Sequence, residues 1–226
     1  MVPRCAATSD TVPSKAKPRI GVFGGAFDPP HRAHVALAEA AFKQLGLAEI
    51  RLVPTGQAPH RNQPLTDGKH RVAMLKLAFE EAGVQSLPGF SWTLDERELQ
   101  RSGLSFMVDT LREIQQENPQ AELFLLIGAD QAQAFTTWHE WTEILNLATL
   151  VVAARESGTE SNKEVFEFES HPNARVLKLN FPLMPISATE VRSRLAQSVT
   201  EPDTLTHWIA SSVAGYIAQH QLYKAA

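Results

Sequence analysis

The stretch that decides the fold is Arg19–Val35, which reads RIGVFGGAFDPPHRAHV. Its first apolar residues, Ile20–Phe23, are typical of a short buried strand. Gly24-Gly25 then lets the backbone turn sharply and approach a ligand closely, because neither residue carries a Cβ. The two prolines that follow disfavour helical geometry in the residue before each, so a helix begins only near His31. The pattern predicts a strand, a glycine turn and a helix in succession.

Two histidines, His31 and His34, lie three residues apart and share one face in the first turn of this helix, which is predicted to end at Gly46. The free N–H groups and the dipole of a helix N-terminus attract anions. The simplest functional interpretation is therefore a phosphate site. Two alternatives stay open: a metal pair, although zinc takes three or four ligands, and a purely structural role.

Length and composition indicate a soluble globular protein. The chain has 226 residues, of which 43% are hydrophobic and 20% charged, enough to bury a sizeable core. No apolar run reaches the roughly 18 residues of a membrane span, so we expect no membrane partner. The single cysteine, Cys5, excludes an intrachain disulfide and suits a reducing cytoplasm.

The distribution of charge favours a small anionic ligand over a polymer. The net charge of −4 argues against nucleic acid as a partner. Between Arg51 and Lys76, however, five basic residues stand against one acidic residue. Residues 1–18 lack any periodicity and are predicted to form a disordered leader before a single domain at 19–226. The residues leave open whether the chain forms a homo-oligomer.

Apolar runs alternate with helical patterns along the rest of the chain. Further strands are predicted at 49–54, 123–130, 149–155 and 176–181, and helices at about 69–82, 105–118, 135–147 and 208–223. The segment 91–103 is predicted to be a strand end running into a loop, with Ser105 capping the next helix, and 156–175 to be a polar, mobile insert. The alternation predicts an α/β fold with a doubly wound, parallel sheet.

Polar residues follow several of these strands, at the edge where open parallel sheets bind ligands. They are His60, Arg61, Asp130 and Arg155. Ser187 and Glu190 fit a capping box, which opens a second helix N-terminus near Thr189 and Arg192. A solvated basic loop, a helix-capping aspartate and a plainly capped helix stay open as alternatives. No Gly-x-Ser-x-Gly or Walker-type motif is present, so the chemistry indicated is positioning and charge neutralisation.

The motif from Gly24 to His34 resembles the nucleotidyltransferase signature GG-T/S-F-D-P-x-H-x-G-H, with Ala26 in place of Thr or Ser and Ala33 in place of Gly. Over Ile20 to Tyr223 the chain resembles the bacterial nicotinate-nucleotide adenylyltransferases. The matching stretches are 24–34, 59–61, 95–99, 105–111, 127–130, Trp138, 186–189 with Arg192, and 222–223. Phe106 and Met107 depart from the Ser-Tyr-Thr usual in this branch.

This resemblance implies a Rossmann-like nucleotidyltransferase fold and adenylyl transfer from ATP to nicotinate mononucleotide, giving deamido-NAD and pyrophosphate in NAD biosynthesis. It implies Mg²⁺ held by ATP and water, without metal ligands from the protein. The catalytic residues that it implies are His31, His34 and Arg192. The implied ATP-binding residues are Gly24, Gly25, Ala26, Phe27, His31, His34, Gly128, Asp130, Arg155, Ile186, Ser187, Thr189 and Arg192. The implied nicotinate mononucleotide-binding residues are His60, Arg61, Phe106, Met107, Trp138 and His139.

Three other functions stay open. The acceptor could be nicotinamide mononucleotide or phosphopantetheine, since the first differs from nicotinate mononucleotide only in an amide for a carboxylate. The chain could be a catalytically silent nucleotide sensor, which Ala26 favours and the intact histidines oppose. A metal-dependent hydrolase using His31 and His34 is the third.

Overall fold

The computed structural model describes residues 16–58, 64–83, 87–155, 166–181, 184–197 and 205–224. Residues 1–15, which make up most of the predicted leader, lie outside the described residues.

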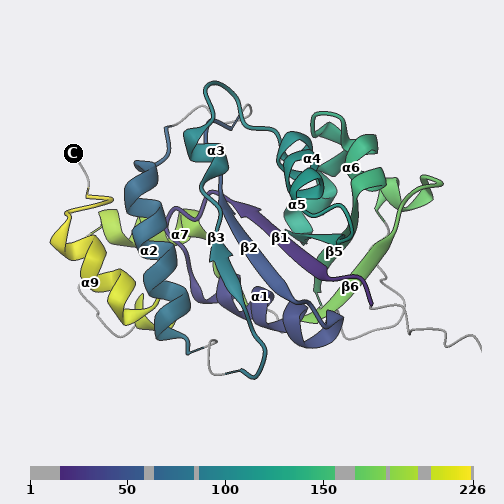
Figure 1. Ribbon diagram of the computed structural model, residues 1–226. Helices are drawn as coiled ribbons and strands as arrows, with labels where there is room; N and C mark the ends of the chain where they lie inside the picture. The colour runs from purple at the N-terminus through teal and green to yellow at the C-terminus, as the bar shows by residue number, and fades with distance from the viewer. Residues whose placement is uncertain are drawn as a thin grey trace, which may run out of the picture.

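A six-stranded parallel sheet forms the centre of the molecule, with strand order β3-β2-β1-β4-β5-β6 (Figure 1). The strands are β1 (Arg19–Gly25), β2 (Glu49–Pro54), β3 (Trp92–Leu94), β4 (Glu122–Gly128), β5 (Ala148–Arg155) and β6 (Val176–Phe181). The order reverses between β1 and β4, which pair directly. Such a reversal opens a crevice at the carboxyl ends of the two strands. The doubly wound parallel sheet predicted from the sequence is confirmed.

Helices cover both faces of this sheet. They are α1 (Arg32–Leu45), α2 (Gly68–Glu81), α3 (Arg97–Gln100), α4 (Met107–Glu117), α5 (Ala129–Gln133), α6 (Trp141–Leu147), α7 (Ala188–Ala196) and α9 (Ser211–Gln219), with short 3-10 turns η2 (Phe135–Thr137) and η3 (Glu167–Ser170). In Figure 1, α4, α5 and α6 gather on one side of the sheet, and α2, α7 and α9 on the other.

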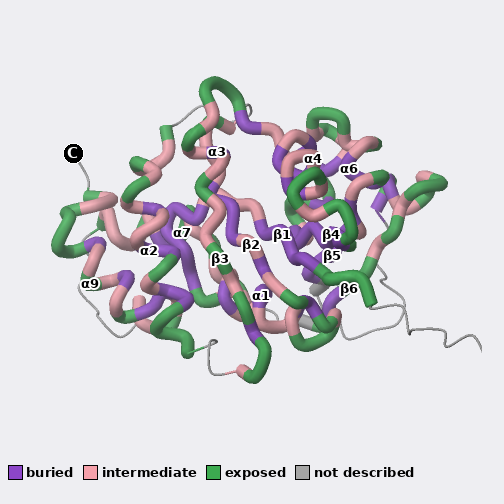
Figure 2. The backbone as a smooth tube through the Cα atoms, viewed as in Figure 1, coloured by how far each residue is buried: buried purple, intermediate pink, exposed green. Residues whose placement is uncertain are grey.

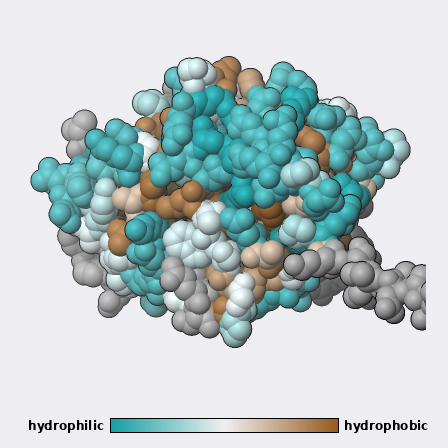
Figure 3. Space-filling view, viewed as in Figure 1, coloured by the Kyte–Doolittle hydropathy of each residue, from teal (hydrophilic) through white to brown (hydrophobic). Residues whose placement is uncertain are grey.

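Alternating side chains of the central strands supply two separate cores. In β4, Leu123, Leu125 and Ile127 pack with α4 and α6, whereas Phe124 and Leu126 pack with α1, α2 and α9. This period of two is expected for a strand covered on both faces. In Figure 2 the central strands are mostly in the buried class, and Figure 3 shows mainly hydrophilic residues over the face in view. Among the described helices, none has the length and apolarity needed to cross a membrane.

The first helix has the predicted limits. His31 is its N-cap, and Gly46 ends it in the left-handed conformation, with φ of 59°. The amide N–H of Gly46 donates to the carbonyl of Phe42 over 3.1 Å. A glycine suits this position because a Cβ would be strained there. The sequence thus fixes both ends of α1, including the N-terminal end that carries the two histidines.

The structure corrects five sequence predictions. The strand predicted at 123–130 ends at Gly128, and Ala129 and Asp130 begin helix α5. The segment 91–103 contains the short helix α3. The N-cap position of α4 is Phe106, without a side-chain capping hydrogen bond, and the Ser105 hydroxyl donates instead to the Glu98 carbonyl. The helix predicted at 135–147 is broken into η2 and α6, and only 211–219 of the last predicted helix is helical.

The predicted insert at 156–175 is partly a piece of the core. Residues 156–165 lie outside the described residues, but Phe166 and Phe168 are buried against the α4–α6 side of the sheet. The ring of Phe168 meets that of Phe135 edge-on, with centroids 4.9 Å apart. Composition alone did not reveal this apolar pair, because Glu164, Glu167 and Glu169 make the surrounding stretch acidic.

Candidate active site

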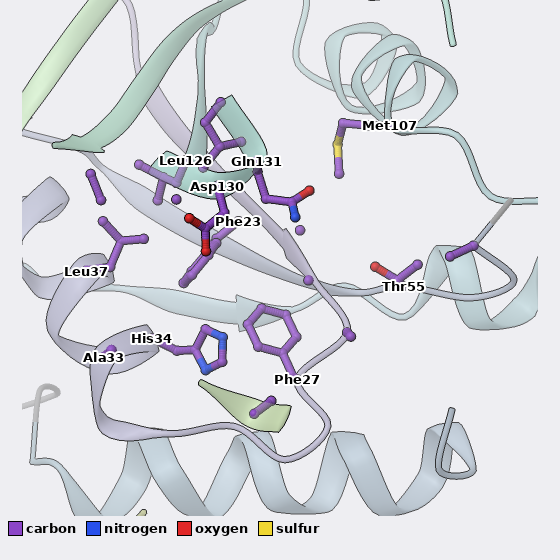
Figure 4. Close-up of a pocket in the computed structure, with 18 of the residues that line it drawn as sticks. Phe23, Phe27, Ala33, His34, Leu37, Thr55, Met107, Leu126, Asp130 and Gln131 are labelled. Carbon is purple, nitrogen blue, oxygen red and sulfur yellow. The ribbon is translucent and has the colours of Figure 1, made fainter. Parts of the chain in front are cut away.

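A cavity of about 640 Å³ opens where β1 and β4 end, at the reversal of strand order (Figure 4). Most of the residues predicted for the site line it. They are Gly24, Gly25, Ala26, Phe27, His31, His34, Phe106, Met107, Gly128, Asp130, Trp138, His139, Ile186 and Ser187. These residues come from the ends of two strands, the starts of the four helices α1, α4, α5 and α7, and the loops between them. The fold thus brings distant parts of the chain into one cavity.

The loop between β1 and α1 turns at Phe27. Gly24 and Gly25 are the last residues of β1 and are extended, because both still pair with β2. The left-handed φ of 49° falls on Phe27 instead, which is unusual for a residue with a large side chain. The predicted sharp turn at the glycines is therefore wrong. Their small size matters nonetheless, since a Cβ on Gly25 would lie 3.0 Å from the Phe27 ring.

His31 and His34 form a stacked pair at the start of α1. Their ring centroids are 3.6 Å apart and the ring planes are inclined by 23°. The backbone N–H of His31 donates to Nδ1 of His34 over 3.0 Å. Because Nδ1 accepts this bond, a neutral His34 ring carries its proton on Nε2. Figure 4 shows the His34 ring beside the Phe27 ring in the cavity wall. The remaining donor of His34 is thus Nε2–H.

Both imidazoles are neutral at physiological pH. Burial lowers the pKa of His31 from 6.5 to about 4. Burial also lowers the pKa of His34 well below its usual value, and repulsion from the adjacent His31 in its protonated form lowers it further. Nδ1 of His31 is buried and has no hydrogen-bond partner within the described segments. A neutral pair can donate hydrogen bonds to phosphate without placing two like charges within one stack.

Arg192 on α7 is bound to the β1–α1 loop and does not line the cavity. Its Nη1 donates to the backbone oxygen of Asp28 over 2.7 Å, and its Nη2 to Oγ1 of Thr189 over 3.2 Å. Thr189 is likewise outside the cavity lining. The guanidinium is therefore held by the same loop that carries His31.

The N-terminus of α7 also faces the cavity. Oγ of Ser187 accepts a hydrogen bond from the Glu190 N–H over 3.1 Å, so the predicted cap at Ser187 is confirmed. Ser187 and Ile186 both line the cavity. A second helix N-terminus thus lies near that of α1, and two such ends favour an anion between them.

Aromatic side chains form another part of the wall. The Phe106 ring lies over the His139 ring, with centroids 4.3 Å apart and planes inclined by 37°. Met107 points into the cavity from α4 in Figure 4, and a Cβ on Gly24 would lie 2.3 Å from its Cε. Trp138 lines the same region. This wall suits a flat ring better than a phosphate chain.

The remaining predicted residues divide into two groups. Gly128 ends β4 and caps α5, and Asp130 lies in the first turn of α5 with its side chain exposed at the cavity. His60 and Arg61 lie outside the described residues. Arg155 ends β5, but its side chain also falls outside the described part of the structure.

Sequence reasoning missed Thr55, Glu98 and Gln131, which also line the cavity. Glu98 is 3% exposed, and its carboxylate accepts hydrogen bonds from the Thr110 hydroxyl over 2.8 Å and from the Gly56 N–H over 3.4 Å. Burial raises the pKa of Glu98. Of these three residues, Thr55 could have been predicted from the sequence, because it directly follows a predicted strand at the edge of the sheet where ligands bind.

No cluster of three or more His, Cys, Asp or Glu side chains suited to a metal ion occurs among the described residues. The metal-pair alternative for His31 and His34 gains no third ligand from this part of the chain.

Known proteins resemble this chain over most of its length. A cytidylyltransferase-like family model matches residues 22–194. A protein of Albidiferax ferrireducens named "Probable nicotinate-nucleotide adenylyltransferase" is 47% identical over 208 residues, 92% of this chain and 99% of that protein. The chain belongs to the nicotinate-nucleotide adenylyltransferase family. Another member of this family, with the same name, comes from Methylibium petroleiphilum. It is 38% identical over 205 residues, which are 91% of this chain and 92% of that protein.

The family fold is also seen in a solved structure. It is that of Plasmodium falciparum nicotinic acid mononucleotide adenylyltransferase complexed with NaAD, and it matches with a TM-score of 0.73 over 91% of this chain and 97% of that one. Sequence identity is 19%, so this likeness supports the fold alone. The Rossmann-like nucleotidyltransferase fold predicted from the sequence is confirmed.

Proposed function

We propose that this protein transfers the adenylyl group of ATP to nicotinate mononucleotide, forming deamido-NAD and pyrophosphate. The observation that carries the proposal is one cavity with two kinds of wall. The neutral His31–His34 pair at the start of α1 suits phosphates, and the aromatic wall at Phe106 and Trp138 suits a planar ring. The membership of the chain in this family supports the same reaction.

The reaction needs no side-chain nucleophile. An oxygen of the mononucleotide phosphate attacks the α-phosphorus of ATP and forms the new P–O bond. The bond from the α-phosphorus to the bridging oxygen breaks, and pyrophosphate leaves with the electron pair. Because the second pKa of such a phosphate is about 6, it is mostly dianionic at neutral pH and needs no general base. Orientation and stabilisation of charge are left for the protein to supply.

On the ATP side, we assign His34 Nε2–H to the α-phosphate and His31 to the neighbouring phosphates. Arg192, with Ser187 and Thr189 at the start of α7, would hold the β- and γ-phosphates. Asp130 would accept hydrogen bonds from the ribose hydroxyls. The remaining ATP contacts in this proposal are Gly24, Gly25, Ala26, Phe27, Gly128, Arg155 and Ile186.

On the acceptor side, the pyridine ring would lie against the aromatic wall. Trp138 and the Phe106–His139 pair offer ring faces, and Met107 lies beside them. Backbone N–H groups near Met107 and His139 would bind the nicotinate carboxylate. His60 and Arg61 complete the proposed acceptor contacts.

Mg²⁺ accompanies ATP in this proposal. Its preferred ligands are phosphate and water oxygens with one or two carboxylates. Asp130 and Glu98 are the carboxylates of the cavity wall, and Glu98 is already hydrogen-bonded to Thr110 and Gly56. This donor set fits an ion carried by the triphosphate rather than one caged by protein. When bound, the ion would neutralise phosphate charge.

The cellular setting follows the same proposal. We infer a cytoplasmic enzyme, since both substrates are soluble nucleotides and the sole cysteine fits a reducing compartment. Whether it works as a homo-oligomer is a separate question that sedimentation of the purified chain would answer.

The test uses the purified chain with ATP, nicotinate mononucleotide and Mg²⁺. We expect pyrophosphate and deamido-NAD in equal amounts, with release abolished by EDTA and restored by excess Mg²⁺. Pyrophosphate released without deamido-NAD would point to hydrolysis instead. ATP binding without any release would identify a nucleotide sensor.

A further inference from the structure

The end of the chain reaches back to the loop that carries the histidines. The Tyr223 hydroxyl donates to Oδ1 of Asp28 over 2.5 Å, a contact between residues 195 positions apart. Asp28 is 4% exposed, and its other oxygen accepts the Thr66 N–H over 3.2 Å. Each carboxylate oxygen of this buried side chain thus has a donor, one from the chain terminus and one from the segment before α2.

The same residue holds the phosphate-side arginine. The backbone oxygen of Asp28 accepts the 2.7 Å hydrogen bond from Arg192 described above. Where the Asp28 peptide lies therefore sets where the guanidinium lies. The hydrogen bonds from Tyr223 and Thr66 hold the Asp28 side chain, and through it they fix the position of the Asp28 peptide.

A buried arginine fixes the other side of the loop. Arg71, which is 3% exposed, donates from Nη1 to the Ala26 oxygen over 2.9 Å and from Nε to the Thr66 oxygen over 2.8 Å. The loop from Ala26 to His31 is thus bound by Thr66 together with the start of α2, by α7 and by the C-terminal segment. Of these three supports, only the last depends on a single side-chain hydroxyl.

The backbone of the terminus is shaped to deliver that hydroxyl. Gln221 and Tyr223 both have positive φ, 54° and 61°, which non-glycine residues adopt only when their surroundings determine it. Between them, the Leu222 N–H donates to the Ile217 oxygen over 3.1 Å, and the Leu222 side chain packs on the core. The chain folds back on α9 here, and Tyr223 is half-buried at the loop.

We propose that Tyr223 is a positioning residue for the ATP side of the site, acting through Asp28 on Arg192 and on the loop that carries His31. This inference rests on the proposed function. Loss of the hydroxyl leaves the buried Asp28 carboxylate short of one donor, so the Asp28 peptide and Arg192 lose their fixed position. Within the described structure, the acceptor wall at Phe106 and Trp138 is not hydrogen-bonded to this network, so binding of the acceptor is unaffected.

The test compares the only two tyrosines of the chain. Tyr216 is the control, because its hydroxyl also joins the C-terminal segment to α2 but does so through His70, whose Nδ1 lies 2.9 Å away, and not through Asp28. For Tyr223→Phe we expect KM for ATP to rise about tenfold, as one lost hydrogen bond to a charged group predicts. KM for nicotinate mononucleotide should stay within twofold. Tyr216→Phe should leave both KM values unchanged, with a similar or larger drop in Tm.

Calorimetric binding of a non-hydrolysable ATP analogue separates this inference from the proposed function. A tenfold weaker Kd in Tyr223→Phe alone supports the positioning role even if no acceptor turns over. Equal Kd in wild type and Tyr223→Phe overturns it, as does equal weakening in Tyr216→Phe. A wild type that binds the analogue but forms no deamido-NAD overturns the proposed function only, and a wild type that binds no analogue overturns both.

Discussion

The backbone N–H of His31 is hydrogen-bonded to Nδ1 of His34, and the two rings lie stacked 3.6 Å apart. One histidine thus fixes the tautomer of the other while burial keeps both rings neutral. The pair is built from a helix N-cap and the third residue after it, so the start of α1 itself sets the geometry. The catalytic donor in this account is a neutral Nε2–H, not an imidazolium.

Removal of the His34 ring should lower turnover without unfolding the protein. We expect His34→Ala to reduce kcat for adenylyl transfer at least a hundredfold, in the range known for the loss of a transition-state hydrogen-bond donor. His34→Gln should be less harmful, because its amide N–H reaches about as far as Nε2. His207→Ala, which alters an exposed histidine, is the control. If His34→Ala had near-normal turnover and an unchanged Tm, the proposed role of His34 as a hydrogen-bond donor to the α-phosphate would be wrong.

Acid should destabilise the protein through His31. Between pH 6.5 and about 4 the unfolded chain holds a proton on His31 that the folded chain lacks. The free energy of unfolding therefore falls as the pH falls through this window, with a limiting slope of about 1.4 kcal/mol per pH unit. Urea unfolding of wild type and His31→Gln at several pH values measures it. The variant should lose less stability on acidification, and parallel pH profiles would contradict the neutral state of this ring.

Two glycine substitutions should have opposite effects on stability. A Cβ on Gly56 would lie 2.1 Å from the Glu98 carbonyl oxygen and 2.6 Å from Ser105 Oγ, so Gly56→Ala should destabilise by about 2 kcal/mol. Gly215 lies within α9, where a Cβ would have open space for 4 Å around it, and Gly215→Ala should stabilise by about 0.5–1 kcal/mol. Chemical denaturation measures both, and changes of equal sign would contradict the packing at Gly56.

Changes to the aromatic wall should alter KM for nicotinate mononucleotide but not KM for ATP. Phe106→Ala removes the ring that lies on His139, and we expect KM for nicotinate mononucleotide to rise about tenfold, as for loss of a stacked aromatic contact. KM for ATP should not change. This is the reverse of the pattern expected for Tyr223→Phe, so each variant serves as the other's control. A rise confined to KM for ATP would contradict the placement of nicotinate mononucleotide against this wall.

The sequence predicted the parts of the fold that depend on local pattern. The limits of α1 follow from Pro30 and Gly46, and β2 and β6 have the residues expected from their apolar runs. The site residues at strand ends could be located because parallel strands end at one edge. His60, Arg61 and the Arg155 side chain lie outside what the structure describes, and their roles remain predictions.

Contacts between distant segments could not be predicted. Helix α3 lies in a charged stretch, and the buried Glu98 carboxylate is hydrogen-bonded there by the Thr110 hydroxyl and the Gly56 amide, which are distant in sequence. The left-handed Phe27 is set by its packing on His34, with ring centroids 5.0 Å apart, and no local turn motif signals it. The Tyr223–Asp28 contact likewise joins residues that no periodicity relates.

The most direct measurement is pyrophosphate release from ATP and Mg²⁺ with three acceptors side by side: nicotinate mononucleotide, nicotinamide mononucleotide and phosphopantetheine. We predict the highest kcat/KM with nicotinate mononucleotide and deamido-NAD as its product, which would leave Phe106 and Met107 as tolerated changes in the family pattern. Equal or faster use of either other acceptor would contradict the proposed substrate while leaving the fold and the phosphate side unchanged.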